Sequence, residues 1–186
     1  MRLFVAAELP GKLYEALCEN SAVLRDKVRG RYVAPDSFHM TLAFLGDVAA
    51  ERVDDVCAAL DEGCELQPPI RVTLGPLGSF GKARRATLWQ GLSLGVDEMG
   101  GLAGDIRECL VAHGLSYDAA AFVPHVTLMR SADLTDGMLP PVQMATGVID
   151  TVTLFRSHLG GERARYEPLY SVRLVDLPAA VEPEEV

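Results

Sequence analysis

The stretch FHMTLAFLG at positions 38–46 decides the fold, because the core of its pattern recurs half a chain later as PHVTL at positions 124–128. We interpret each copy as a β-strand, in which residues two apart share a face. The His and Thr of each copy then point one way, while Met40, Leu42 and Phe44 point the other way, into the core. Two copies of one strand pattern predict two halves of the chain that face a single site.

The repeated residue types indicate acid–base chemistry on an anionic group. Imidazole can both accept and donate a proton near neutral pH, and a threonine hydroxyl is a neutral donor suited to an anionic oxygen. His39 and His125 would supply an acid and a base, and Thr41 and Thr127 would bind the anion. The residues alone do not distinguish the acid from the base. Chance placement of two histidines in half-buried strands is the alternative, and the identical spacing of His and Thr argues against it.

The doubled His-x-Thr-Leu pattern resembles the signature of the two-histidine (2H) phosphoesterase superfamily. Three further stretches are similar to its RNA 2′,3′-cyclic phosphodiesterase branch, also called 2′-5′ RNA ligase or LigT-like: MRLFVA at positions 1–6, LFRS at 154–157 and ARYEPL at 164–169. The resemblance runs from the first residues to about Leu174.

The resemblance implies a reaction and a role for each motif residue. His39 would donate a proton to the leaving ribose oxygen, His125 would accept a proton from water, and Thr41 and Thr127 would bind phosphate oxygens. The substrate would be an RNA 3′ end or a small nucleotide carrying a 2′,3′-cyclic phosphate, and the product a 2′-phosphomonoester. The same groups could join such an end to a 5′-hydroxyl in a 2′-5′ bond. The reaction would need neither a metal nor another cofactor.

Other residues are candidates at the edge of this site. Strict alternation from His125 would point Arg130 toward the face of Val126 and Leu128. Either the strand ends there and bends Arg130 into the site as a further phosphate contact, which we favour, or Arg130 is a surface residue. Tyr166 and His158 flank a Gly-rich loop and could stack on a base, although ordinary loop residues are the simpler interpretation. A basic loop, KARR at positions 82–85, could meet phosphates or form a solvated hairpin tip, and the sequence leaves both open.

Composition limits the kind of partner. The chain has 186 residues, of which 49% are hydrophobic and 23% charged, and its formal net charge is −9. A surface that grips duplex nucleic acid through many phosphates is strongly basic, so we expect a local contact at an RNA terminus. No leader-like pattern precedes the predicted strand 3–9, and no apolar run approaches the roughly 20 residues that span a bilayer. We therefore expect a cytoplasmic protein without a membrane contact, and we also expect a monomer.

Periodicity predicts an α+β fold. The expected strands are 3–9, 38–46, 70–77, 87–94, 122–129, 147–156 and 170–175, and the expected helices are 11–29, 49–63 and 96–113. The family resemblance adds a bilobal, pseudo-two-fold duplicated arrangement, with two antiparallel sheets flanking a central cleft and helices on the outside. We expect one such domain over residues 1–177 and an acidic disordered tail over 178–186.

Rival functions remain to be separated. A divalent metal site built from His39, His125 and a carboxylate is disfavoured, because neither motif carries the nearby Asp, Glu or second His that metal sites use. A nucleotide-binding module without turnover is another class, although binding alone would not require a matched acid and base. A 2H phosphodiesterase for another small cyclic nucleotide is the third possibility.

Overall fold

Two antiparallel sheets make up the core of the computed structural model, which describes residues 1–158 and 164–175. The four-stranded sheet has the order β3-β1-β8-β9, with β1 at Arg2–Ala7, β3 at Met40–Asp47, β8 at Thr151–His158 and β9 at Arg165–Arg173. The five-stranded sheet has the order β2-β6-β5-β4-β7, with β2 at Arg29–Tyr32, β4 at Ile70–Phe80, β5 at Ala86–Leu94, β6 at His125–Asp133 and β7 at Thr146–Ile149. The predicted tail over 178–186 lies outside the described residues.

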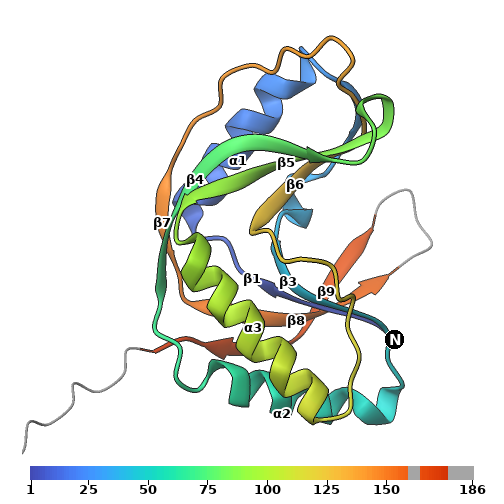
Figure 1. The fold of residues 1–186 in the computed structure, drawn as a ribbon, viewed down its shortest axis with the longest axis vertical. Helices are drawn as coiled ribbons and strands as arrows, with labels where there is room; N and C mark the ends of the chain where they lie inside the picture. The colour runs from blue at the N-terminus through green and yellow to red at the C-terminus, as the bar shows by residue number, and fades with distance from the viewer. Residues whose placement is uncertain (159–163, 176–186) are drawn as a thin grey trace, which may run out of the picture.

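Three α-helices cover these sheets: α1 at Gly11–Arg25, α2 at Val53–Cys64 and α3 at Val96–Ala112. The α1 helix presents Leu13, Leu17 and Leu24 as a fully buried stripe and packs against β2 and β7 of the five-stranded sheet. The α2 and α3 helices pack on each other and contact β9 and β3 of the four-stranded sheet. Figure 1 shows α1 in the upper half of the molecule and α2 and α3 in the lower half. The predicted α+β fold with two antiparallel sheets is confirmed.

The two halves of the sequence interlock. Strand β2 comes from the first half but pairs with β6, and β8 and β9 come from the second half but extend the sheet that contains β1. Helix α1 follows β1 yet covers the other sheet, and α3 follows β5 yet contacts β3. Each sheet therefore depends on residues from both halves.

The strand predicted over 147–156 is wrong, because the structure divides it at Asp150. Strand β7 ends at Ile149 in the five-stranded sheet, and β8 begins at Thr151 in the four-stranded sheet. The Asp150 carboxylate accepts a hydrogen bond from the Thr151 hydroxyl at 2.9 Å, and the backbone N–H of Leu174 donates to the Asp150 carbonyl at 2.8 Å. A continuous alternating pattern cannot reveal a change of sheet, because both strands bury the same kind of residue.

A β-bulge interrupts β3 directly after the first motif. Ala6 pairs with Thr41 while the preceding Val5 pairs with Ala43, so Leu42 is one residue extra. Leu42 and Ala43 are both fully buried, although strict alternation would place them on opposite faces. The bulge shifts the pattern by one residue.

The same bulge recurs in β6. Trp89 pairs with Thr127 while the preceding Leu88 pairs with Met129, so Leu128 is the extra residue and both Leu128 and Met129 are fully buried. Arg130 therefore falls on the face of His125 and Thr127, and it is exposed. The expected bend toward the site is produced by this bulge, and β6 continues to Asp133 rather than ending.

The bulge also corrects the expectation for Phe44. We predicted a core position, but the shift places Phe44 on the face of His39 and Thr41, in the position that Arg130 occupies in β6. Its ring is only partly buried, and the Arg2 guanidinium carbon lies 4.9 Å from the ring centroid. Period-two reasoning fails at both sites for the same physical reason.

Candidate active site

The two motif histidines lie where the two sheets approach each other. His39 directly precedes β3 and His125 begins β6, and these strands are in contact. The charge of His125 is among the causes that lower the pKa of His39, so the two imidazoles are within electrostatic reach. The structure thus brings together the residues that the repeated motif singled out.

Both imidazoles are held in the same way by the backbone. His39 Nδ1 lies 2.8 Å from the carbonyl oxygen of Ser37, and His125 Nδ1 lies 2.6 Å from that of Val123. A carbonyl oxygen can only accept, so each Nδ1 carries a proton. Each neutral ring therefore has a bare Nε2 that can accept a proton, and each charged ring has an Nε2–H that can donate one.

Burial suppresses the charge of both rings. The pKa of His39 is lowered to about 4, chiefly because burial removes water from the charged form, and the positive charge of Arg130 lowers it further. The pKa of His125 is lowered by the same two causes, with burial again the larger. In both cases the Nδ1 hydrogen bond to the backbone opposes the shift.

Aromatic rings supply much of this burial around His39. The centroids of Phe4 and Tyr166 lie 4.8 and 5.0 Å from the His39 ring, and Phe4 stacks in turn on Phe155 at 5.3 Å. Phe4 belongs to β1 and is 3% exposed, so it forms a floor beneath His39. Tyr166 lies on β9 opposite Ser157, on the same face as the histidine.

A second pair of aromatic residues surrounds His125. Phe80 at the end of β4 and Trp89 of β5 lie 5.1 and 5.5 Å from the His125 ring, and 5.1 Å from each other. The indole lies across Gly78, where an added Cβ would come within 2.2 Å of a ring carbon. Gly78 therefore keeps the space in which Trp89 stands beside His125.

Three polar side chains share the faces of the two histidines. Thr41 and Thr127 are partly exposed, and neither hydroxyl has a hydrogen-bond partner within residues 1–158 and 164–175. Arg130 is exposed and lowers the pKa of both imidazoles by its charge, so its guanidinium acts on both sides of the site. Two neutral donors and one cation are thus available to an anion between the histidines.

The remaining candidate, His158, is placed elsewhere. In β8 it lies one residue past Ser157, so its side chain leaves the face of Tyr166. Its Nε2 lies 2.7 Å from an Oε2 of Glu167 on the neighbouring strand. The structure thus brings Tyr166 to the histidine pair but pairs His158 with a carboxylate at the β8–β9 end. The part of the chain that the structure describes contains no group of three or more His, Cys, Asp or Glu that could hold a metal ion.

Comparisons with known proteins assign the chain to a family. The sequence model of the family "LigT like Phosphoesterase" matches residues 11–89. The RNA 2′,3′-cyclic phosphodiesterase of Escherichia coli strain K12 is 32% identical over 168 residues, which cover 90% of this chain and 93% of the relative. The chain belongs to the LigT-like phosphoesterases.

Solved structures support the assignment. The crystal structure of E. coli LigT complexed with 3′-AMP matches with a TM-score of 0.81 at 31% identity, over 94% of this chain and 98% of that chain. A crystal structure of a Thermus thermophilus protein matches with a TM-score of 0.76 at 28% identity and the same coverage. The resemblance to the LigT-like branch of the 2H superfamily is confirmed.

One residue that supports the site of this LigT-like phosphoesterase was not evident from the sequence. Arg107 of α3 donates from Nε to the carbonyl oxygen of Leu42 at 2.9 Å, at the bulge that follows the first motif. Its guanidinium carbon lies 5.2 Å from the Tyr117 ring and 5.3 Å from the Phe122 ring, in the segment that leads to His125.

The equivalent carbonyl of β6 is satisfied in a different way. Leu128, the extra residue of the second bulge, accepts from the backbone N–H of Val33 at 2.9 Å. Strand β3 lies at the edge of its sheet, so Arg107 takes the place of that backbone donor. No pattern in the sequence signals such a role, because an arginine on a helix usually faces solvent.

The structure also bears on membrane contact: within the described ranges, no helix is both long and apolar enough to cross a bilayer.

Proposed function

We propose that this protein is a metal-independent phosphodiesterase that opens the 2′,3′-cyclic phosphate of RNA 3′ ends or of small nucleotides to a 2′-phosphomonoester. We also propose that it acts as a monomer, since one chain supplies both histidines, and that it works in the cytoplasm. The observation that carries the proposal is the matched pair of imidazoles, each with Nδ1 bound to a carbonyl oxygen and Nε2 left for proton transfer. A binding module would not require that pair.

The mechanism assigns one proton transfer to each ring. His125 Nε2 accepts a proton from water as the water oxygen attacks phosphorus, and the bond from phosphorus to the ribose 3′ oxygen breaks. His39 Nε2–H gives its proton to that 3′ oxygen. The oxygen at the 2′ position keeps the phosphoryl group, so the product is the 2′-phosphomonoester. With a 5′-hydroxyl in place of water, the same transfers form a 2′-5′ bond.

The anionic phosphoryl oxygens are stabilised by donors that need not move. The Thr41 and Thr127 hydroxyls donate to the non-bridging oxygens, and the Arg130 guanidinium neutralises the charge that develops there. The bound anion also favours an imidazolium, which offsets the low pKa of His39 and makes it an acid when substrate is present. Tyr166 lies against His39 and offers an aromatic surface for the base of the terminal nucleotide.

The deciding experiment uses a nucleoside 2′,3′-cyclic phosphate with excess EDTA, and phosphorus NMR identifies the product. Turnover to the 2′-monoester is the expected result. The 3′-monoester would overturn the assignment of the leaving oxygen. Binding without turnover would indicate a nucleotide-binding module, loss of turnover with EDTA would indicate a metal site, and turnover restricted to a 3′,5′-cyclic nucleotide would indicate a different substrate class.

A further inference from the structure

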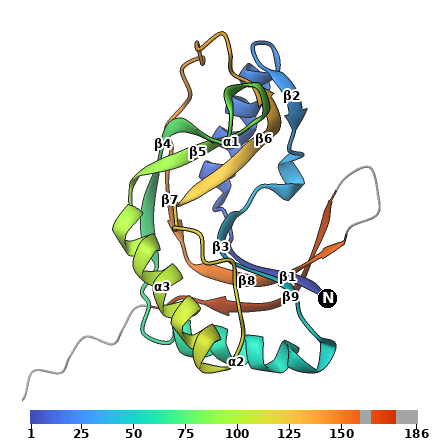
Figure 2. The same cartoon turned by 45° about the vertical axis from the view of Figure 1, so that its right-hand side comes forward.

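Basic residues cluster at one edge of the five-stranded sheet, outside the site described above. Seven of the 17 Lys and Arg residues fall within positions 25–31 and 82–85, where Asp26 is the single acidic residue, although the net charge of the chain is −9. Strand β2 lies at the edge of the sheet beside β6, as Figure 2 shows, and the turn at Ala83–Arg85 reaches β6 through a hydrogen bond from the Leu134 N–H to the Ala83 carbonyl at 2.7 Å. Both basic segments therefore border the strand that begins with His125.

Arg31 continues the site laterally from Arg130. The two residues are direct cross-strand partners, so their side chains share a face of the sheet. Tyr32, the next residue of β2, points the other way, because its hydroxyl donates to the Leu24 carbonyl of α1 at 3.0 Å. Arg31 is therefore on the face that carries His125, and it is exposed.

The row continues along this edge with Arg29, beyond a register shift in the pairing of β2 with β6, and with Arg84. Arg29 is the cross-strand partner of Asp133, and the charges of Arg29 and Arg84 both contribute to the lowered pKa of Asp133, after the hydrogen bonds that Thr135 donates to it. Asp133 is thus the acidic neighbour of this row, and it is already engaged by Thr135 at 2.6 and 3.1 Å.

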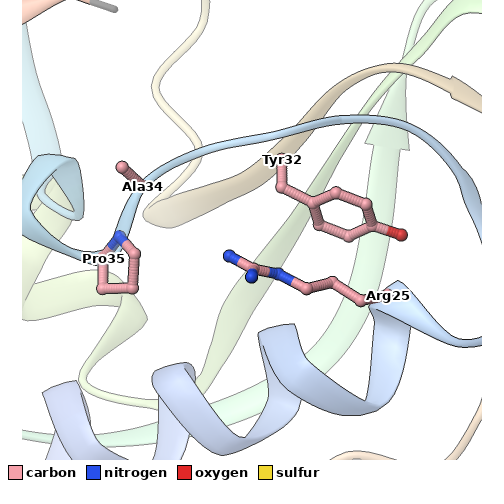
Figure 3. Close-up of a pocket in the computed structure, with 4 residues that line it drawn as sticks. All are labelled: Arg25, Tyr32, Ala34 and Pro35. Atoms are coloured by element: carbon pink, nitrogen blue, oxygen red, sulfur yellow. The ribbon is translucent and has the colours of Figure 1, made fainter.

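Arg25 belongs to a different environment. It lines an open pocket of about 470 Å³ together with Tyr32, Ala34 and Pro35, on the helix side of β2. Its guanidinium carbon lies 5.3 Å from the Tyr32 ring, and Figure 3 shows both side chains in this pocket. Arg25 is therefore not part of the row that continues from Arg130.

The arrangement is costly without an anion. Like charges directly opposite each other in a sheet are destabilising, yet Arg31 faces Arg130. Among the ion pairs formed between described residues, none includes Arg29, Arg31, Arg84 or Arg130. An exposed row of cations that begins at the phosphate-binding arginine fits a chain of phosphates connected to the phosphate in the site.

We propose that Arg31, Arg29 and Arg84 form an extended site for the RNA strand on the 5′ side of the cyclic phosphate, a proposal that rests on the proposed function. The row binds backbone phosphates and reads no base. It makes a polynucleotide end a better substrate than a mononucleotide, although the chain as a whole is acidic. Three phosphate contacts on a single strand predict a slope of about −2 for log affinity against log salt concentration.

The test compares a labelled RNA decamer ending in a 2′-phosphate with a nucleoside 2′-monophosphate, by fluorescence anisotropy and competition at several salt concentrations. Wild-type protein should bind the decamer at least about tenfold more tightly at low salt, with the steep salt dependence above. The variant R29Q/R31Q/R84Q should lose that preference and most of the slope. Its kcat/KM on a nucleoside 2′,3′-cyclic phosphate should stay within about twofold of wild type.

The matched control removes the same charge from three residues around β7, away from the row of cations. Arg71 of β4 is the cross-strand partner of Val148 of β7. Arg173 of β9 forms an ion pair with Asp150, just past β7, and Lys12 lies in the first turn of α1. The variant K12Q/R71Q/R173Q should keep decamer binding and nucleotide turnover, and circular dichroism should show that both variants are folded.

Three results would overturn the extended site. The first is equal decamer affinity in the two triple variants, and the second is no preference of wild type for the decamer. The third is that R29Q/R31Q/R84Q keeps the decamer preference but loses binding to phosphatidylserine vesicles. A wild-type protein that turns over no cyclic phosphate would instead overturn the proposed function. The decamer comparison would still decide whether the row binds RNA.

Discussion

His39 and His125 have matching hydrogen bonds but act as a pair, so their contributions to catalysis should not be independent. Replacing either imidazole by Ala should lower kcat on a nucleoside 2′,3′-cyclic phosphate by about 10²- to 10⁴-fold, because each removes one proton transfer. The double variant should lose less than the product of the two effects. T41A and T127A should be milder. Near-full turnover by H39A would exclude an acid–base role for His39.

The low pKa values of both rings set the pH at which the free enzyme works. The reactive form has one ring protonated and one neutral, so kcat/KM should pass through a maximum between the two apparent pKa values of the pair. Burial lowers the pKa of both imidazoles below the ordinary 6.5, and it lowers the pKa of His39 to about 4. The kcat/KM maximum should therefore lie below pH 6.5. The kcat profile should lie at higher pH than that of kcat/KM, because bound phosphate favours the imidazolium.

Arg130 provides a direct test of this account. Its charge lowers the pKa of both histidines, so R130Q should raise both values and move the kcat/KM maximum toward higher pH, together with a loss of rate from the missing phosphate contact. Steady-state rates from pH 4 to 8 measure the shift. A lower rate with an unmoved maximum would mean that Arg130 acts on substrate alone.

Strand pairing between β4 and β5 places the Trp89 ring beside His125. Gly78 is the cross-strand partner of Trp89, and a Cβ there would meet the indole at 2.2 Å. G78A should therefore displace the ring, lower the free energy of unfolding by about 1–3 kcal/mol and reduce turnover. Trp89 is the single tryptophan of the chain, so its fluorescence reports the displacement directly. G100A is the control, because nothing lies within 4 Å of a Cβ at that position. An unchanged emission spectrum in G78A would contradict the packing described.

Helix α3 fixes the other histidine strand through Arg107. R107M should leave the Leu42 carbonyl without its donor, lower the free energy of unfolding by about 1–2 kcal/mol and speed amide exchange around the bulge. Hydrogen exchange read by mass spectrometry localises the effect. R71M is the control, because Arg71 is an exposed residue of β4 in the other sheet. Equal exchange in the two variants would show that Arg107 does not hold the strand edge.

The sequence could predict the motif residues of the site but not the residues that surround them. The repeated His-x-Thr-Leu pattern is local, so alternation within a few residues of each motif correctly put His and Thr on one face. Beyond the motifs, the bulge in β3 places Phe44 on that face and the bulge in β6 places Arg130 there. A bulge leaves no periodic pattern in the sequence that could predict it. Asp150 marks a second limit, since a pattern of buried residues does not say which sheet buries them. Phe4, Phe80 and Arg107 reach the site through pairings between distant segments, which no local pattern encodes.

Because its two halves interlock, we expect the described chain to fold as one unit. Strands β8 and β9 complete the sheet of β1, and α1 covers the sheet of β5, so neither half can bury its apolar face alone. We therefore expect a single cooperative unfolding transition rather than one for each sheet. The two histidines lie where these sheets meet, so their protonation is coupled to the stability of the whole.

That coupling gives a measurable dependence of stability on pH. His39 has a pKa of about 4 in the folded protein and about 6.5 when unfolded, so the unfolded chain binds more protons between these values. Its contribution is present above pH 6.5 and is lost as the pH falls toward 4, by at most about 3 kcal/mol. Urea unfolding of wild type and H39N at several pH values isolates this part, because carboxylates titrate equally in both. The stability difference between the two proteins should shrink or reverse in sign as the pH falls, and inorganic phosphate should restore wild-type stability most strongly at pH 5 to 6. Parallel curves for the two proteins would show that His39 is not buried in its neutral form.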